Sequence, residues 1–213
     1  LPLMLGNLFQ QLYNMADAII VGKCVGKHAL SAVGAVGPLN FLIIGSVIGL
    51  CAGFAIPVAQ SFGAGNKKLT NHYAGNAISL TIIISLTIMS LSLFLVKPIL
   101  TLLGTPSEIF DDARLYVSII YAGAIFTTLY NVMASILRAL GDSKAPLKFL
   151  TVTAVLNVFL NYFTIAVLGM GVDGAAISTV LSQLVSCILC VIYIRGRKEM
   201  LNITWEDFKI KKT

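Results

Sequence analysis

The chain has 213 residues, of which 57% are apolar and 11% charged, and its formal net charge is +6. Its mean hydropathy is +0.90, whereas about a quarter of the residues in soluble domains are charged, so this composition excludes a water-soluble globular protein. The positive charge does not indicate a nucleic-acid partner, because basic residues in a membrane chain more often record topology.

Six apolar stretches follow one another along the chain, each ended by glycine, proline or charge. A helix that crosses the hydrocarbon core of about 30 Å needs about 20 apolar residues. The predicted transmembrane helices cover residues 1–22, 35–62, 74–103, 114–138, 147–169 and 174–195. Because these runs are apolar on all sides, unlike the alternating strands of a membrane barrel, the predicted fold class is all-α, a polytopic six-helix bundle.

The predicted domain organisation is a transmembrane lobe over residues 1–195, followed by a linker over 196–213. The first stretch shows no signal-peptide pattern, and we expect the first helix to be truncated. The last residues are charged and amphipathic, which favours a cytoplasmic linker toward a second lobe over a seventh span.

The basic residues are divided unevenly between the two sides of the predicted bundle. The side that holds the second loop, the fourth loop and the tail carries Lys67, Lys68, Arg138, Lys144, Lys148, Arg195, Arg197, Lys198, Lys209, Lys211 and Lys212. The opposite side carries Lys23, Lys27, Lys97 and Arg114. The positive-inside rule therefore places both termini in the cytoplasm, and the lack of a targeting segment fits a plasma (inner) membrane.

One acid, Asp17, lies well inside an apolar stretch. An intramembrane carboxyl group costs at least a few kcal/mol to bury, and low dielectric disfavours its charged form, so it can exchange a proton. Gln10 and Asn14 share a helix stripe with it, and Tyr13 precedes it by four residues. This pattern predicts a functional site, although a structural acid satisfied by a neighbouring amide is the alternative.

Polar residues at helical spacing also mark the last three predicted spans. They are Thr128, Asn131 and Ser135, then Thr153, Asn157, Asn161 and Thr164, then Thr179, Ser182, Gln183 and Ser186. Together they could line a polar cavity. For any single hydroxyl the alternative is a hydrogen bond that holds two helices together.

Glycines and cysteines suggest packing rather than chemistry. Gly45, Gly49 and Gly53 recur every four residues in the second span, a face that lets another helix come close. The four cysteines are scattered and form no tetrahedral metal set. No nucleophile and base face each other in the predicted bundle, so we do not expect an enzyme.

Three sequence blocks resemble the multidrug and toxic compound extrusion (MATE) family. NMADAIIVGKCVGKHALSAVGAVG at 14–37 resembles that family's first-helix signature, and QSFGAGN at 60–66 the end of its second helix. ILRALGDSKAP at 136–146 and GVDGAAIST at 171–179 resemble its fourth to sixth helices. The resemblance implies the amino-terminal half of a twelve-helix, two-lobe antiporter that exports organic cations or amphipathic drugs in exchange for H+ or Na+.

The resemblance also implies roles for single residues. Asp17 falls on the family's first-helix acid, Tyr13 on an aromatic position one turn before it, and Asn157 on a fifth-helix asparagine. Asn131 and Thr179 fall near other members of that polar set. Asn161 departs from the pattern, because proton-coupled members often have a second acid there. Asp17 would then bind a proton alone or supply one ligand to Na+, and no other cofactor is expected.

The expected mechanism is secondary active efflux by alternating access. Its expected partners are a small organic cation, the lipid bilayer and a second six-helix lobe. A flippase for lipid-linked saccharides is one alternative, but it needs Lys or Arg midway through a span, and none is found. A non-transport membrane assembly subunit is the other.

Overall fold

The computed structural model describes residues 15–197 and 199–208. Every regular element in these residues is helical, which confirms the all-α prediction. Residues 15–24 are helical and form the described part of the first predicted span. The labelled elements are α2 (Lys27–Ala35), α3 (Gly37–Gly63), α4 (Lys67–Leu102), α5 (Ser107–Ala122), α6 (Ala124–Ala139), α7 (Lys144–Asn161), a π-helix η1 (Tyr162–Val167), α8 (Val172–Gly196) and a 3-10 helix η2 (Trp205–Phe208).

The lengths of the helices support a multi-pass membrane protein. Within the described residues, four helical segments are long and apolar enough to cross a bilayer: α3, α4, α7 continued by η1, and α8. The pair α5 and α6 is bent by 46° and makes a fifth span if it is counted as one. The remaining one of the six predicted spans is the one over residues 1–22, which lies partly outside the described residues.

The span predicted over 114–138 is interrupted at Gly123, between α5 and α6. A Cβ added at Gly123 would lie 2.4 Å from Cγ2 of Val180 in α8, so the missing side chain of Gly123 makes room for the Val180 side chain. The apolar run does not record this tertiary contact.

One helix, α2, lies where a connection between the first two predicted spans was expected. It begins after Gly26, whose φ of 120° belongs to glycine. Its nine residues are too few to cross a bilayer. Instead Ala29 and Ala32 are buried, and the helix packs on α5.

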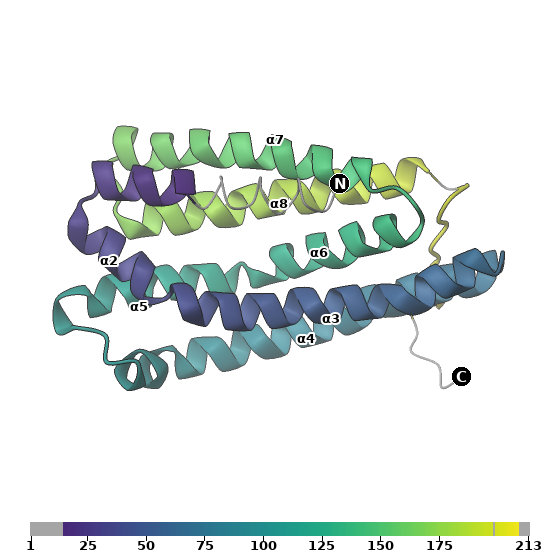
Figure 1. The fold of residues 1–213 in the computed structure, drawn as a ribbon, viewed down its shortest axis with the longest axis horizontal. Coiled ribbons are helices and arrows are strands. Elements are labelled where there is room, and N and C mark those ends of the chain that lie inside the picture. The colour runs from purple at the N-terminus through teal and green to yellow at the C-terminus, as the bar shows by residue number, and fades with distance from the viewer. Residues whose placement is uncertain (1–14, 198, 209–213) are drawn as a thin grey trace.

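The bundle is layered, with α7 and α8 on one side and α3 and α4 on the other (Figure 1). The helix α6 packs against α3, α4 and α8, whereas α7 packs mainly against α8 and continues into η1. An apolar core between α3, α4, α6 and α8 contains Val58, Ala74, Val132, Ile136 and Cys190, all fully buried or nearly so. The first helix and α7 therefore lie at the margin of this core.

The glycine face of α3 is open in this lobe. A Cβ added at Gly45, Gly49 or Gly53 would meet no atom within 4 Å. The close helix contact predicted for this face is therefore not made by the described residues of the chain. Pro57 lies inside the same helix, which continues to Gly63.

Residues 199–208 dock on the side of α4, and we call this segment the strap. The backbone carbonyl oxygen of Asp207 lies 2.5 Å from the position of a Cβ added at Gly75. Ser79 donates its hydroxyl to the carbonyl oxygen of Phe208 at 3.0 Å, and the backbone N–H of Asn202 donates to Asn71 at 3.2 Å. Leu201 is 4% exposed, so the described part of the predicted linker is packed against the lobe.

Candidate functional site

A buried carboxylate and two buried amides join the first helix to α7. Asp17 is 8% exposed, and Asn157 and Asn161 are fully buried. The Nδ2 of Asn161 donates to Oδ1 of Asp17 at 2.6 Å and to Oδ1 of Asn157 at 2.8 Å. The two asparagines lie one turn apart on α7, so a single helix face presents both amides toward the acid.

The same network reaches α8 through Thr179. The Nδ2 of Asn157 lies 3.5 Å from Oγ1 of Thr179, at the outer limit of a hydrogen bond. The structure thus brings together four of the residues singled out from the sequence, and they come from three helices. We call Asp17, Asn157, Asn161 and Thr179 the carboxylate-amide network.

The other predicted site residues are not part of this network. Asn131 lies on α6, where its Nδ2 donates to the carbonyl oxygen of Thr127 in the same helix at 2.8 Å. In the part of the chain that the structure describes, no hydrogen bond links Asn131 to Asp17. The predicted residues Gln10, Tyr13 and Asn14 lie outside the described residues.

The connection from α7 to α8 fixes the position of Asn161, the last residue of α7. In η1, which follows directly, Thr164 contacts the hydroxyl of Ser178 at 2.9 Å and donates to the carbonyl oxygen of Gly174 at 3.2 Å. A Cβ at Gly174 would lie 2.8 Å from Cβ of Met170, so glycine is required for this approach. Ser178 was not singled out, although its place beside Thr179 in GVDGAAIST could have marked it.

Asn161 is suited to a partner whose charge changes. Its Oδ1 is buried and has no hydrogen-bond partner in the described structure, while its Nδ2 donates to Asp17. A primary amide has donors on one atom and an acceptor on the other. Its nitrogen can therefore serve an ionised Asp17, and after a flip its oxygen can accept from a protonated Asp17 or face a cation.

The oxygen atoms of the network also fit a hard cation. Carboxylate and amide oxygens are the ligands that such cations prefer, and Asp17, Asn157 and Asn161 supply them at one place. In the described residues no group of three or more His, Cys, Asp or Glu could hold a metal, so a transition-metal centre of that kind is not built here. The donor and acceptor groups of the network are of the kinds that suit a proton or a hard cation.

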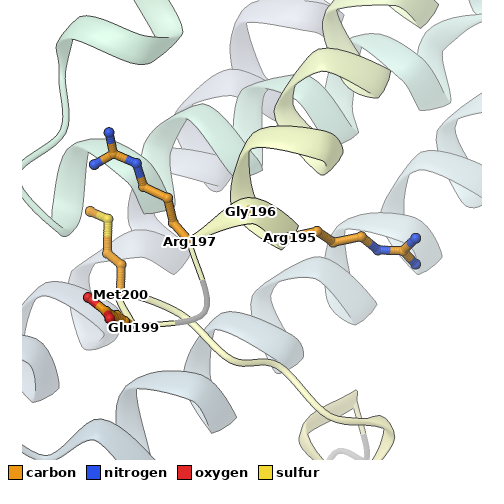
Figure 2. Close-up of a pocket in the computed structure, with 5 residues that line it drawn as sticks. All are labelled: Arg195, Gly196, Arg197, Glu199 and Met200. Atoms are coloured by element: carbon orange, nitrogen blue, oxygen red, sulfur yellow. The ribbon is translucent and has the colours of Figure 1, made fainter.

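Two cavities among the described residues lie elsewhere. One of about 580 Å³ is lined by the α6–α7 loop, the start of α7 and the end of α8. The other, of about 520 Å³, is lined by residues from Arg195 to Met200 (Figure 2). Neither is lined by Asp17.

Comparison with known proteins gives consistent matches over this chain. The family model MatE matches residues 2–163. The chain is 31% identical over 206 residues to "Probable multidrug resistance protein YoeA" of Bacillus subtilis, covering 94% of this chain and 44% of that protein. It is 28% identical over 190 residues to "FAD transporter" of Shewanella oneidensis, covering 87% of this chain and 42% of that protein.

A solved structure described as "MATE in the bent conformation" superposes with a TM-score of 0.92 at 30% identity. The match covers 100% of this chain and 47% of that one. The chain therefore spans about half the length of the relatives it matches.

Proposed function

Because the chain belongs to the MatE family, we propose that it forms the amino-terminal lobe of a secondary active efflux transporter that exchanges its substrate for H+ or Na+. The observation that carries the proposal is the carboxylate-amide network. A buried carboxylate hydrogen-bonded by an amide at 2.6 Å, on the first helix of a membrane lobe, is the kind of group that marks ion pathways in transporters.

Asp17 is the coupling residue in this proposal. When it is ionised, Asn161 donates to it and the first helix is held against α7. When a proton or Na+ neutralises it, this charge-assisted bond weakens, and the amide is free to turn its oxygen toward the new partner. An ion that binds one arrangement better than the other shifts the conformational equilibrium by that difference in affinity.

The remaining parts of the proposal concern the complete protein. A second six-helix lobe encloses the substrate cavity with this one, and rocking of the two lobes exposes the cavity to each side in turn. The protein lies in the plasma membrane with both ends of this chain in the cytoplasm, and it acts as a transporter rather than an enzyme. Organic cations or amphipathic drugs are the substrates in this proposal, and the YoeA relative is named a probable multidrug resistance protein.

The test is transport by the complete gene product in proteoliposomes. A pH gradient and a Na+ gradient are imposed separately, and movement of ethidium, a fluorescent organic cation, is measured. FAD serves as a second probe, because one relative is named an FAD transporter. We expect one of the two gradients to drive ethidium transport by the parent protein. The Asp17→Asn variant should lose this transport.

The matched control is Asp111→Asn, which removes an exposed carboxylate on α5. It should transport as the parent does. Transport of FAD alone would replace the cation substrate class by an anionic one. If neither gradient moves either probe, or if Asp17→Asn behaves as the parent, the coupled-efflux proposal is wrong.

A further inference from the structure

The cavity of about 580 Å³ lies where the chain enters α7 and leaves α8. Its floor is aromatic: Phe149 and Tyr193 meet edge to face, with ring centroids 5.5 Å apart. The described residues that line it are Leu140, Gly141, Asp142, Ser143, Lys144, Ala145, Lys148, Phe149, Tyr193, Arg197 and Met200. The strap thus contributes Met200, and the α6–α7 loop forms one wall.

The charge of this cavity is positive. Lys144, Lys148 and Arg197 line it, and Asp142 is the one acid among its described lining residues. The Asp142 carboxylate is already engaged, because Oδ2 accepts from the hydroxyl of Tyr193 at 2.5 Å and Oδ1 from the backbone N–H of Ala145 at 3.1 Å. Three cationic groups thus face one acid, and the cavity stays positive although Arg197 also interacts with the Asp142 carboxylate.

Arg197 is held over the cavity by its aromatic floor. Its guanidinium carbon lies 4.9 Å from the centroid of the Tyr193 ring, within the range of a cation–π contact. Figure 2 shows that Arg195 leaves the end of α8 in a different direction. Arg197 lines this cavity together with Lys144 and Lys148, and it also lines the neighbouring cavity of about 520 Å³.

The cavity lies at the predicted level of a membrane surface. Two segments that can span a bilayer meet there, since one begins at Lys144 and the other ends at Gly196. This is also the side to which the distribution of Lys and Arg assigns the cytoplasm. Basic pockets at this position beside transmembrane helices bind the head groups of anionic lipids.

An apolar face of α7 continues from the cavity along the predicted membrane depth. Lys148, Val152, Val155 and Phe159 recur at spacings of four, three and four, which places them on one helix face. Val152 is 53% exposed, Val155 56% and Phe159 71%. A head group beside Lys148 would therefore have its acyl chains against exposed apolar side chains, which a free phosphate ion could not use.

We propose that this cavity binds the phosphate head group of an anionic phospholipid whose acyl chains lie along the exposed face of α7. Lys144, Lys148 and Arg197 are the phosphate ligands, and the Phe149 and Tyr193 rings form the floor under the head group. The proposal depends on the membrane placement of α7 and α8 and not on the role of Asp17.

The test is lipid retention by the complete gene product, purified in detergent with equal amounts of phosphatidylglycerol and phosphatidylcholine and measured by native mass spectrometry. Lys144→Gln/Lys148→Gln should lower phosphatidylglycerol retention by about tenfold or more, because each cation near an anionic surface contributes roughly fivefold. Lys144→Arg/Lys148→Arg keeps the charge and should retain the lipid. Size-exclusion profiles show that each variant is folded.

The matched control is Lys67→Gln/Lys68→Gln, an exposed pair on the same predicted side at the start of α4. It removes the same charge and should leave retention unchanged. Equal retention of the two lipids, or an equal loss in the control, would overturn the proposal. Binding of inorganic phosphate without any lipid preference would overturn the phospholipid assignment.

Discussion

Two of the buried polar networks that join helices in the described residues are satisfied in different ways. Between α4 and α6, the hydroxyls of Ser85 and Thr128 contact each other. Each hydroxyl also has a carbonyl oxygen of its own helix within hydrogen-bond distance, that of Thr81 at 2.6 Å from Ser85 and that of Ile125 at 3.0 Å from Thr128. The carboxylate-amide network has no such local option, because Asp17 accepts from Asn161, 144 positions along the chain.

The difference separates helix packing from a functional site. A hydroxyl that bonds its own helix costs little to bury, and a second hydroxyl opposite it adds a modest interhelical contact. A carboxylate has no donor of its own when ionised, so its burial depends on a partner from another helix. Hydroxyls that bond their own helix hold a bundle together, whereas a buried carboxylate and its amide partner respond when the charge of the carboxylate changes.

The largest expected effect comes from removing the donor to the carboxylate. Asn161→Leu leaves Asp17 buried without this hydrogen bond, so we expect a loss of about 1–3 kcal/mol in unfolding free energy. The loss should shrink when the pH is low enough to protonate Asp17, because a neutral carboxyl group needs the donor less. Thermal unfolding of the detergent-solubilised protein at several pH values measures it, and a pH-independent loss would contradict an ionised Asp17.

The next effect concerns coupling rather than stability. Asn161→Asp places a second carboxyl group beside Asp17, and two close carboxyl groups share a proton. We expect proton-driven exchange to persist about one pH unit or more further into the alkaline range than in the parent. The measurement is the initial transport rate in proteoliposomes against pH. An unchanged profile would mean that this position does not sense the charge of Asp17.

A smaller effect is expected in the hydroxyl network. A double-mutant cycle of Ser85→Ala and Thr128→Ala should give a coupling of about 0.6 kcal/mol, and neither variant should change the driven transport rate by more than about twofold. Unfolding of the two single variants and the double variant gives the coupling. A coupling as large as the Asn161→Leu effect would erase the distinction between the two networks.

The smallest effect is expected at Asp142, whose carboxylate lies outside the predicted membrane-spanning segments. Partial burial raises the pKa of Asp142, but hydrogen bonds from Tyr193 and Ala145, with Arg197 nearby, hold this pKa below its usual range. A lowered folded-state pKa stabilises the protein at neutral pH, and that stability is lost as the pH falls through it. Asp142→Asn should therefore be slightly less stable than the parent at pH 7.

The difference between Asp142→Asn and the parent should begin to shrink as the pH falls past about 4, where an unfolded aspartate takes up its proton, and it should close only below the lowered folded-state pKa of Asp142. Unfolding curves of both proteins at pH 7, 4 and 2.5 measure this. A difference that stays constant over this range would mean that Asp142 contributes by packing and not by charge.

The sequence was most informative where burial in lipid dictates composition. The spans predicted over 35–62 and 174–195 differ from α3 and α8 by only one or two residues at each end, because long apolar runs leave one choice of structure. The helix stripes and the family resemblance predicted that Asp17, Asn157 and Asn161 belong to one site. Their roles in coupling stay predictions.

What the sequence could not show depends on contacts between distant residues. Gly123 has no room for a Cβ beside the Val180 side chain of α8, and Gly75 has none beside the backbone of the strap at Asp207. Thr128 was grouped with Asn131 as a cavity residue, but it is buried between α4 and α6. A polar stripe records which face avoids lipid and not which neighbour covers it.

The strap has a mechanical consequence for the lobe. It leaves α8, passes to α4 and docks there at Gly75 and Ser79, while α6 packs against both of these helices. The strap thereby links α4 to α8, and its Met200 also reaches the start of α7. Asp17 and Asn161 join the first helix to α7 far from this strap contact, so we expect neutralisation of Asp17 to raise amide hydrogen exchange first in these two helices.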